Sequence, residues 1–201
     1  MANPRDAAAH TAPEWIVPLV RAILAVVPAV VITFSPDHSP ESGLIVFGCW
    51  ALATGLVVGA LSLRRFGDRV SRSLFAANGV ITTAAGILAL GLFGGGLGFF
   101  LYLVTVWAAL TGFLELYAGL RVRGRSTSSR DWLTAGGLTA VLAIVFLLLP
   151  PNAVVAVGLL GAYLVILAVF LGIAAFSLKW NVAGKARAAT ASAALSDSDP
   201  S

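Results

Sequence analysis

The sequence contains little charge and few residues that could bind a metal. Only 11% of its 201 residues are charged, against roughly 25% in soluble domains. The single cysteine, Cys49, excludes an intrachain disulfide, and the two histidines, His10 and His38, lie far apart in the chain. P-loop, GxSxG and HExxH motifs are absent from the sequence. We therefore expect no catalytic, cofactor-binding or metal-binding residue, and a protein that is not an enzyme.

The abundant residues are apolar. Hydrophobic residues make up 59% of the chain, and its mean hydropathy is +0.94. Such a composition indicates a chain that is mostly surrounded by lipid. The net charge is +4, but the basic residues form short clusters beside apolar runs, where they set membrane orientation. We therefore expect the lipid bilayer, and not nucleic acid, to be the partner of these charges.

Six apolar stretches are long enough to cross a membrane, which takes roughly 20 helical residues. They form a predicted membrane domain at 14–180, between tails at 1–13 and 181–201 that are expected to be disordered. The predicted spans are about 15–34, 43–63, 74–93, 99–120, 132–149 and 153–178.

The charges outside the predicted spans are distributed asymmetrically. Lys and Arg fall in the two tails and in the second and fourth connections, at 64–72 and 121–130. The other three connections, at 35–42, 94–98 and 150–152, contain neither. By the positive-inside rule, we expect both termini to be cytoplasmic. The first span is expected to be an uncleaved helix, because the sequence before it lacks the basic-then-apolar order of a signal peptide and no convincing small-residue cleavage site follows.

An internal repeat organises these spans. Trp50–Arg64 and Trp107–Arg121 share the same spacing of features at an offset of about 57 residues, and Tyr163–Lys179 is a weaker third copy. Each unit is a two-helix hairpin that enters and leaves on the cytoplasmic side, so all units point the same way. The predicted fold is an all-α, polytopic membrane bundle of six transmembrane helices, arranged as three parallel-repeat hairpins.

Two ionisable residues lie within the predicted spans at equal depth. Arg21 follows Trp15 by about six positions and Glu115 precedes Arg121 by about six, so each lies about 9 Å from the cytoplasmic boundary. A charge inside the membrane is costly and is usually paired. Arg21 either pairs with Glu115 or extends to the nearby headgroups. We expect Glu115 to face the bundle interior, either ionised against Arg21 or protonated and hydrogen-bonded.

Other polar residues recur at the repeat interval. The offset aligns Arg21 with Asn78 and Thr134, either by chance near the interface or because the three line a common axis. Hydroxyl groups within spans are expected to bond to their own helices, and they include Thr54, Thr82, Thr83, Thr105 and Thr111. The GxxxG pairs Gly55/Gly59 and Gly91/Gly95 indicate close helix contact, within the chain or in a homodimer.

The segment Trp132–Lys179 carries a family resemblance. Its WLTAGGLTAVLAIVFLLLPP, followed by VGLLGAYLVILAVFLGIAAFSLK, resembles the HdeD-like membrane proteins. These are small bacterial proteins with six spans built from hairpins, and the likeness extends over most of residues 15–180. The resemblance implies a multi-pass protein of the bacterial inner membrane that is linked to acid or stress resistance.

Two classes of function remain open. The first is a non-enzymatic structural or interaction protein whose partners are the bilayer and either further copies of the chain or another membrane protein. The second is a small transporter or channel for an unidentified ion or small molecule, which would use a polar site formed by Arg21, Asn78, Thr134 and Glu115. Water-filled surroundings of these four residues favour the second class, and a dry, packed interior favours the first.

Overall fold

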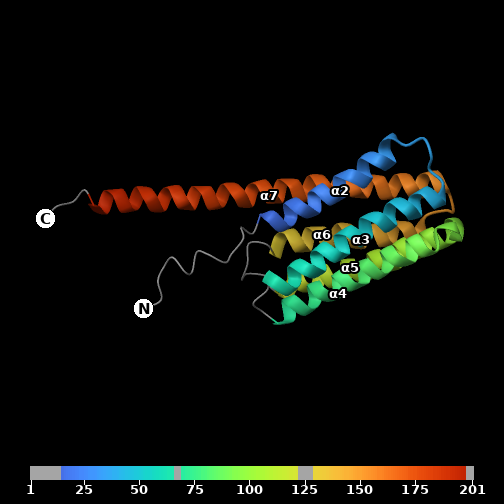
Figure 1. Cartoon of the computed structure of the whole chain (residues 1–201), viewed down its shortest axis with the longest axis horizontal. Helices are drawn as coiled ribbons and strands as arrows, with labels where there is room; N and C mark the ends of the chain where they lie inside the picture. The colour runs from blue at the N-terminus through green and yellow to red at the C-terminus, as the bar shows by residue number, and fades with distance from the viewer. Residues whose placement is uncertain (1–14, 66–68, 122–128, 198–201) are drawn as a thin grey trace.

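The computed structural model describes residues 15–65, 69–121 and 129–197, and the regular elements within these ranges are all helical (Figure 1). The expected N-terminal tail at 1–13 lies outside the described residues. The elements in chain order are α2 (Ile16–Phe34), α3 (Pro40–Arg65), α4 (Arg69–Gly91), the 3₁₀ turn η1 (Phe93–Gly95), α5 (Gly96–Arg121), α6 (Ser129–Leu148) and α7 (Ala153–Asp197).

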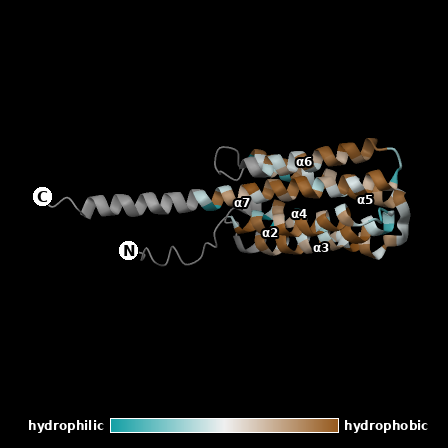
Figure 2. Cartoon of the chain, turned by 90° about the horizontal axis from the view of Figure 1, so that it is seen from above, coloured by the Kyte–Doolittle hydropathy of each residue, from teal (hydrophilic) through white to brown (hydrophobic). Residues whose placement is uncertain are grey.

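The helices have the length and composition of membrane spans. Five apolar helical segments in the described residues can cross a bilayer, namely Ile16–Phe34, Pro40–Leu61, Arg72–Gly91, Phe93–Arg121 and Ala153–Trp180, and a sixth, Trp132–Leu148, is shorter. Figure 2 shows hydrophobic residues along much of each helix in the bundle, and many of the large ones are exposed on its surface. Phe113 and Leu147, for example, are 67% and 74% exposed. By length and composition, the chain is a multi-pass membrane protein.

The C-terminal helix is longer than expected. Disorder was expected for residues 181–201, but α7 continues as a helix to Asp197 and extends beyond the rest of the bundle (Figure 1). The segment after Trp180 is rich in alanine, the residue with the highest helix propensity. Its low-complexity composition was therefore misread as disorder, because an alanine-rich segment that follows a stable helix can prolong that helix.

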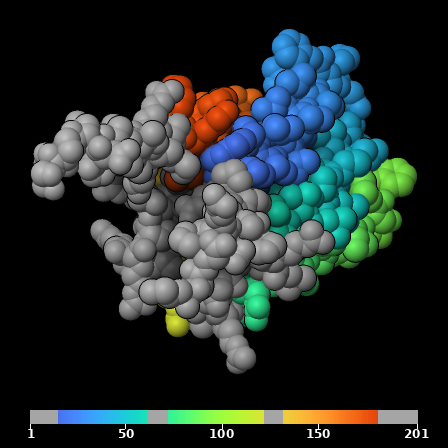
Figure 3. Space-filling model, turned by 60° about the vertical axis from the view of Figure 1, so that its left-hand side comes forward, coloured from blue at the N-terminus to red at the C-terminus, as the bar shows by residue number. Residues whose placement is uncertain are grey.

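The closest helix pairs are not the predicted hairpins. α3 packs most extensively on α4, α5 on α6, and α7 on α2, whereas the hairpin partners α2/α3, α4/α5 and α6/α7 contact each other less. Figure 3 shows α2 in blue beside α7 in orange-red, so the first and the last helix of the bundle are neighbours. The returning helix of each hairpin therefore packs on the first helix of the next.

Glycine explains how closely these pairs approach. A Cβ atom on Gly79 of α4 would lie 2.8 Å from the Cα of Gly59 on α3, and one on Gly136 of α6 would lie 2.7 Å from the backbone nitrogen of Leu116 on α5. Small residues at such positions allow backbones to touch. Gly55 also faces α4, close to the backbone of Thr83. The Gly55/Gly59 pair thus serves contact within the chain.

The second GxxxG pair behaves differently from the first. Nothing lies within 4 Å of a Cβ atom built on Gly91, so among the described residues this position has room for a side chain. Gly96, the first residue of α5, has φ +71°. Glycine adopts this left-handed conformation without steric penalty. The glycine-rich segment therefore forms the turn between α4 and α5, as its composition predicts.

The two ends of the bundle differ in charge. The α2–α3, α4–α5 and α6–α7 connections lie together at one end (Figure 1), where Asp37 Oδ1 accepts a hydrogen bond of 2.9 Å from the Ser39 amide just before α3. At the opposite end, the Lys179 ammonium lies 5.2 Å from the centre of a Trp15 ring. This cation–π contact joins the start of α2 to α7.

Candidate functional site

The two intramembrane charges form an ion pair. Arg21 Nη2 on α2 donates to Glu115 Oε1 on α5 across 2.8 Å, and the two side chains are 16% and 7% exposed. Of the two alternatives open for Arg21, pairing and extension to the headgroups, the structure shows pairing. The pairing that was predicted from the equal depth of the two residues in different helices is therefore confirmed.

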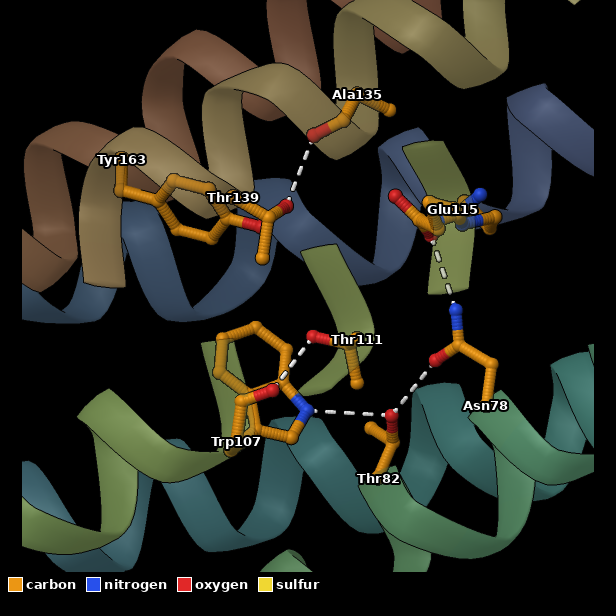
Figure 4. A network of polar contacts seen from close by, with 9 residues as sticks. Asn78, Thr82, Trp107, Thr111, Glu115, Ala135, Thr139 and Tyr163 are labelled. Carbon is orange, nitrogen blue, oxygen red and sulfur yellow. Dashed lines mark hydrogen bonds and ion pairs between the residues drawn. The ribbon is translucent and has the colours of Figure 1, made fainter. Parts of the chain in front are cut away.

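Asn78 on α4 joins the pair. Its Nδ2 donates to the same Glu115 Oε1 at 3.3 Å, and its Oδ1 accepts from the Thr82 hydroxyl at 3.2 Å (Figure 4). Thr82 in turn accepts from Trp107 Nε1 at 3.2 Å. A continuous chain of hydrogen bonds therefore runs from Trp107 through α4 and back to Glu115 on α5.

The three hydrogen bonds all run in the same donor-to-acceptor direction, from Trp107 to Glu115. The indole N–H of Trp107 can only donate, so Thr82 must accept from it and is left to donate to Asn78. The Asn78 amide can then present its N–H to Glu115. Both hydrogen bonds at Glu115 Oε1 are thus accepted by the carboxyl group.

A second polar pair lies on the third repeat. The hydroxyl oxygens of Thr139 on α6 and Tyr163 on α7 are 2.9 Å apart, and Thr139 also donates to the Ala135 carbonyl at 2.9 Å (Figure 4). The Tyr163 ring packs edge-on against Trp107, with ring centres 6.3 Å apart, and Trp107 packs likewise on Trp50 at 5.2 Å. These aromatic rings form one side of the polar site.

The polar residues surround a central cavity of about 30 Å³, and all six helices contribute to its wall. Its lining repeats with the sequence. α3, α5 and α7 each supply three side chains, spaced one helical turn apart, so the wall has three levels. The first level is Trp50, Trp107 and Tyr163, the second is Thr54, Thr111 and Leu167, and the third is Val58, Glu115 and Leu171. The cavity therefore lies where the three repeats meet, close to their common axis.

Thr134 does not belong to this site. Its side chain is exposed and does not line the cavity, so its inclusion in the predicted polar group was wrong. The offset of about 57 residues that relates Arg21 to Asn78 leads to Ala135, which is 1% exposed. Because successive residues of an α-helix point about 100° apart, an alignment that slips by one position selects a residue on another face.

Sequence reasoning missed four residues of the site: Thr82, Trp107, Thr139 and Tyr163. Thr111 and Thr83 do bond to carbonyls of their own helices, as expected, whereas Thr82 bonds between helices. The signal that could have found it is the repeat itself, since Thr82 and Thr139 are related by the same offset as Trp50 and Trp107. A hydroxyl group that recurs with an aromatic partner is a better candidate for a cross-helix bond.

The arrangement brings one acidic side chain, Glu115, into contact with one cationic side chain, Arg21. Within the described ranges, no group of three or more His, Cys, Asp or Glu side chains could hold a metal. What the site can do is hold opposite charges together inside an apolar bundle, link α2, α4 and α5 through one set of hydrogen bonds, and link α6 to α7 through another.

Comparison with known proteins identifies the repeat. The model of a family described as a short repeat of unknown function (DUF308) matches residues 20–90 and again residues 77–149. The second match begins at the repeat offset from the first, and each includes a tightly packed pair, α3/α4 or α5/α6. Searches of curated proteins and of solved structures found no match. Two matches that together extend over most of the chain show that the protein belongs to the DUF308 short-repeat family.

Proposed function

We propose that the protein is a non-enzymatic, HdeD-like protein of the bacterial inner membrane that contributes to acid or stress resistance. The family match and the apolar helices support the coarser part of this statement, a membrane protein with a repeat of unknown function. The acid-resistance role comes from the likeness of Trp132–Lys179 to HdeD-like proteins. Its molecular partners are the lipid bilayer and either another copy of the chain or another membrane protein.

One observation carries the choice of a structural or interaction role. The charged and polar side chains at the centre are mostly engaged with one another, and they enclose only about 30 Å³. A solute-binding cleft in a protein usually measures roughly 300–1,000 Å³. The centre has room for no more than one or two water-sized molecules, so it is far closer to the packed interior expected of a structural protein than to the wet cavity of a transporter.

The proposed topology has six spans with both termini in the cytoplasm. The shortest apolar segment, Trp132–Leu148 of α6, still reaches the lower limit of roughly 17 residues for a transmembrane helix. The connections at the end of the bundle that holds Asp37 and Glu41 contain no Lys or Arg. The positive-inside rule then places that end outside.

A survival assay tests the proposed role. Deletion of the gene should lower the survival of the host bacterium after an acid challenge, and a plasmid copy should restore it. Glu115→Gln should restore survival poorly, because it breaks the central ion pair. Arg72→Gln, at an exposed position on α4, is the matched control and should restore it fully at equal protein abundance. Equal survival of the deletion strain and its parent would exclude the role.

A small transporter or channel is the second candidate. The observation that favours it is the ion pair itself, since charges buried within a membrane often mark ion paths, and Arg21 and Asn78 line the cavity. Purified protein in proteoliposomes with a pH-sensitive dye inside would decide between the two. We expect no proton flux above that of empty liposomes. A flux that Glu115→Gln abolishes would establish the second candidate and refute the structural one.

A further inference from the structure

The three repeats differ in how their central aromatic residue is bonded. In the second repeat, Trp107 Nε1 donates to Thr82, and in the third, the Tyr163 hydroxyl bonds Thr139. The repeat offset places Trp50 and Ala25 at these positions in the first repeat. Ala25 has no hydroxyl group. The Trp50 indole N–H accordingly has no hydrogen-bond partner among the described residues.

A second unpaired group lies one helical turn away. The Thr54 hydroxyl also lacks a partner within the described part of the chain, although its counterpart Thr111 donates to the Trp107 carbonyl at 2.7 Å. Trp50 and Thr54 are only 5% and 8% exposed, and both line the central cavity. Buried polar groups are nearly always hydrogen-bonded, so two of them on one cavity wall indicate a bound molecule.

We propose that the central cavity binds a small, neutral hydrogen-bond acceptor, one or two water molecules in size, between Trp50 Nε1 and Thr54 Oγ1. The size follows from the volume, because a water needs about 10–15 Å³ of such space and the cavity has about 30 Å³. The guest must accept a hydrogen bond, because an indole N–H can only donate.

The charges around the cavity determine that the guest is neutral. Arg21 is already paired with Glu115 at 2.8 Å, so the wall has no unbalanced positive charge. An anion would bring one uncompensated charge into the apolar bundle, which is strongly unfavourable. Water can bond to both unpaired groups. It accepts a hydrogen bond from the Trp50 indole N–H, and it either donates to or accepts from the Thr54 hydroxyl.

Nuclear magnetic resonance on the full-length protein in nanodiscs of phosphatidylcholine and phosphatidylglycerol tests the site directly. Indole N–H signals are assigned with Trp50→Phe and Trp107→Phe, and magnetisation transfer from water to each indole proton is measured. Transfer should reach the Trp50 proton and not that of Trp107, which donates to Thr82. No transfer at Trp50, or a Trp50 signal that titrates with chloride in place of such transfer, would overturn the proposal.

Two substitutions extend the test. Ala25→Thr gives the first repeat the hydroxyl that Thr82 and Thr139 supply in the others, and it should displace the guest and abolish the transfer at Trp50. Thr54→Val should lower the midpoint of thermal unfolding by about 2–4 °C, since one bond to the guest is lost. An unchanged or raised midpoint in Thr54→Val, or transfer retained in folded Ala25→Thr, would contradict the proposal. If Ala25→Thr does not fold, the wild-type measurement decides.

Discussion

The ion pair between Arg21 and Glu115 makes the sharpest prediction about stability. Removing one partner of a buried pair costs about 3–5 kcal/mol, since the other charge is left uncompensated. The two residues are not equivalent, because Arg21 is 16% exposed and Glu115 only 7%. A long arginine side chain can also extend toward the headgroups, whereas a glutamate cannot.

Arg21→Met should therefore destabilise the protein more than Glu115→Gln. We expect about 3–5 kcal/mol for Arg21→Met, which leaves a buried carboxylate whose remaining hydrogen-bond donor is Asn78. Glu115→Gln should fall at or below the lower limit of that range, because arginine can relocate. The double variant removes both charges and should cost less than the sum, by about 1–3 kcal/mol.

Reversible unfolding in mixed micelles, followed by circular dichroism, provides the three free energies of unfolding. Arg72→Met is the control for loss of an arginine, since Arg72 is exposed at the start of α4 and its removal should change stability by less than about 0.5 kcal/mol. Additivity of the two single substitutions to within about 0.5 kcal/mol would refute the pairing. Equal costs for the two would refute the argument from exposure.

Two further substitutions probe the packing and the hydrogen-bond chain. Gly79→Ala should destabilise the bundle by about 1–3 kcal/mol, because the new Cβ would lie 2.8 Å from the Gly59 backbone. Gly158→Ala is the control, since the space around its Cβ is open, and it should leave stability unchanged or raise it. Thr82→Val keeps the shape but removes the acceptor for Trp107, and it should cost about 1–3 kcal/mol and shift the Trp107 indole N–H resonance. A neutral Gly79→Ala, or an unshifted indole signal in folded Thr82→Val, would contradict these contacts.

The spans and the repeat could be predicted because they depend on local properties of the chain. Apolar length predicts helices, and the offset of about 57 residues returned in the two family matches. The depth argument also found the contact between Arg21 and Glu115. It succeeded because an isolated charge in lipid has few alternatives to a partner at its own depth.

The helix pairing could not be predicted in the same way. Short connections indicate which helices follow one another, but the closest contacts are made where glycine backbones meet, as at Gly59 and Gly79. Hydropathy also does not determine how a helix is rotated about its axis, and therefore which residues face the interior. The repeat alignment was off by one residue and selected the exposed Thr134, whereas the neighbouring Ala135 is buried. Such choices depend on the three-dimensional packing of all six helices together.

The site also explains what is gained by carrying three hairpins in one chain. Three identical copies around an axis would place three Arg21 side chains, or three Glu115 side chains, at one level, and like charges would repel there. In this chain the positions equivalent to Arg21 hold Asn78 and Ala135, and those equivalent to Glu115 hold Val58 and Leu171. One cation, one anion and one amide can then meet around a shared centre. The three hairpins share one pattern of helix packing, and the polar interior depends on the repeats having diverged in sequence.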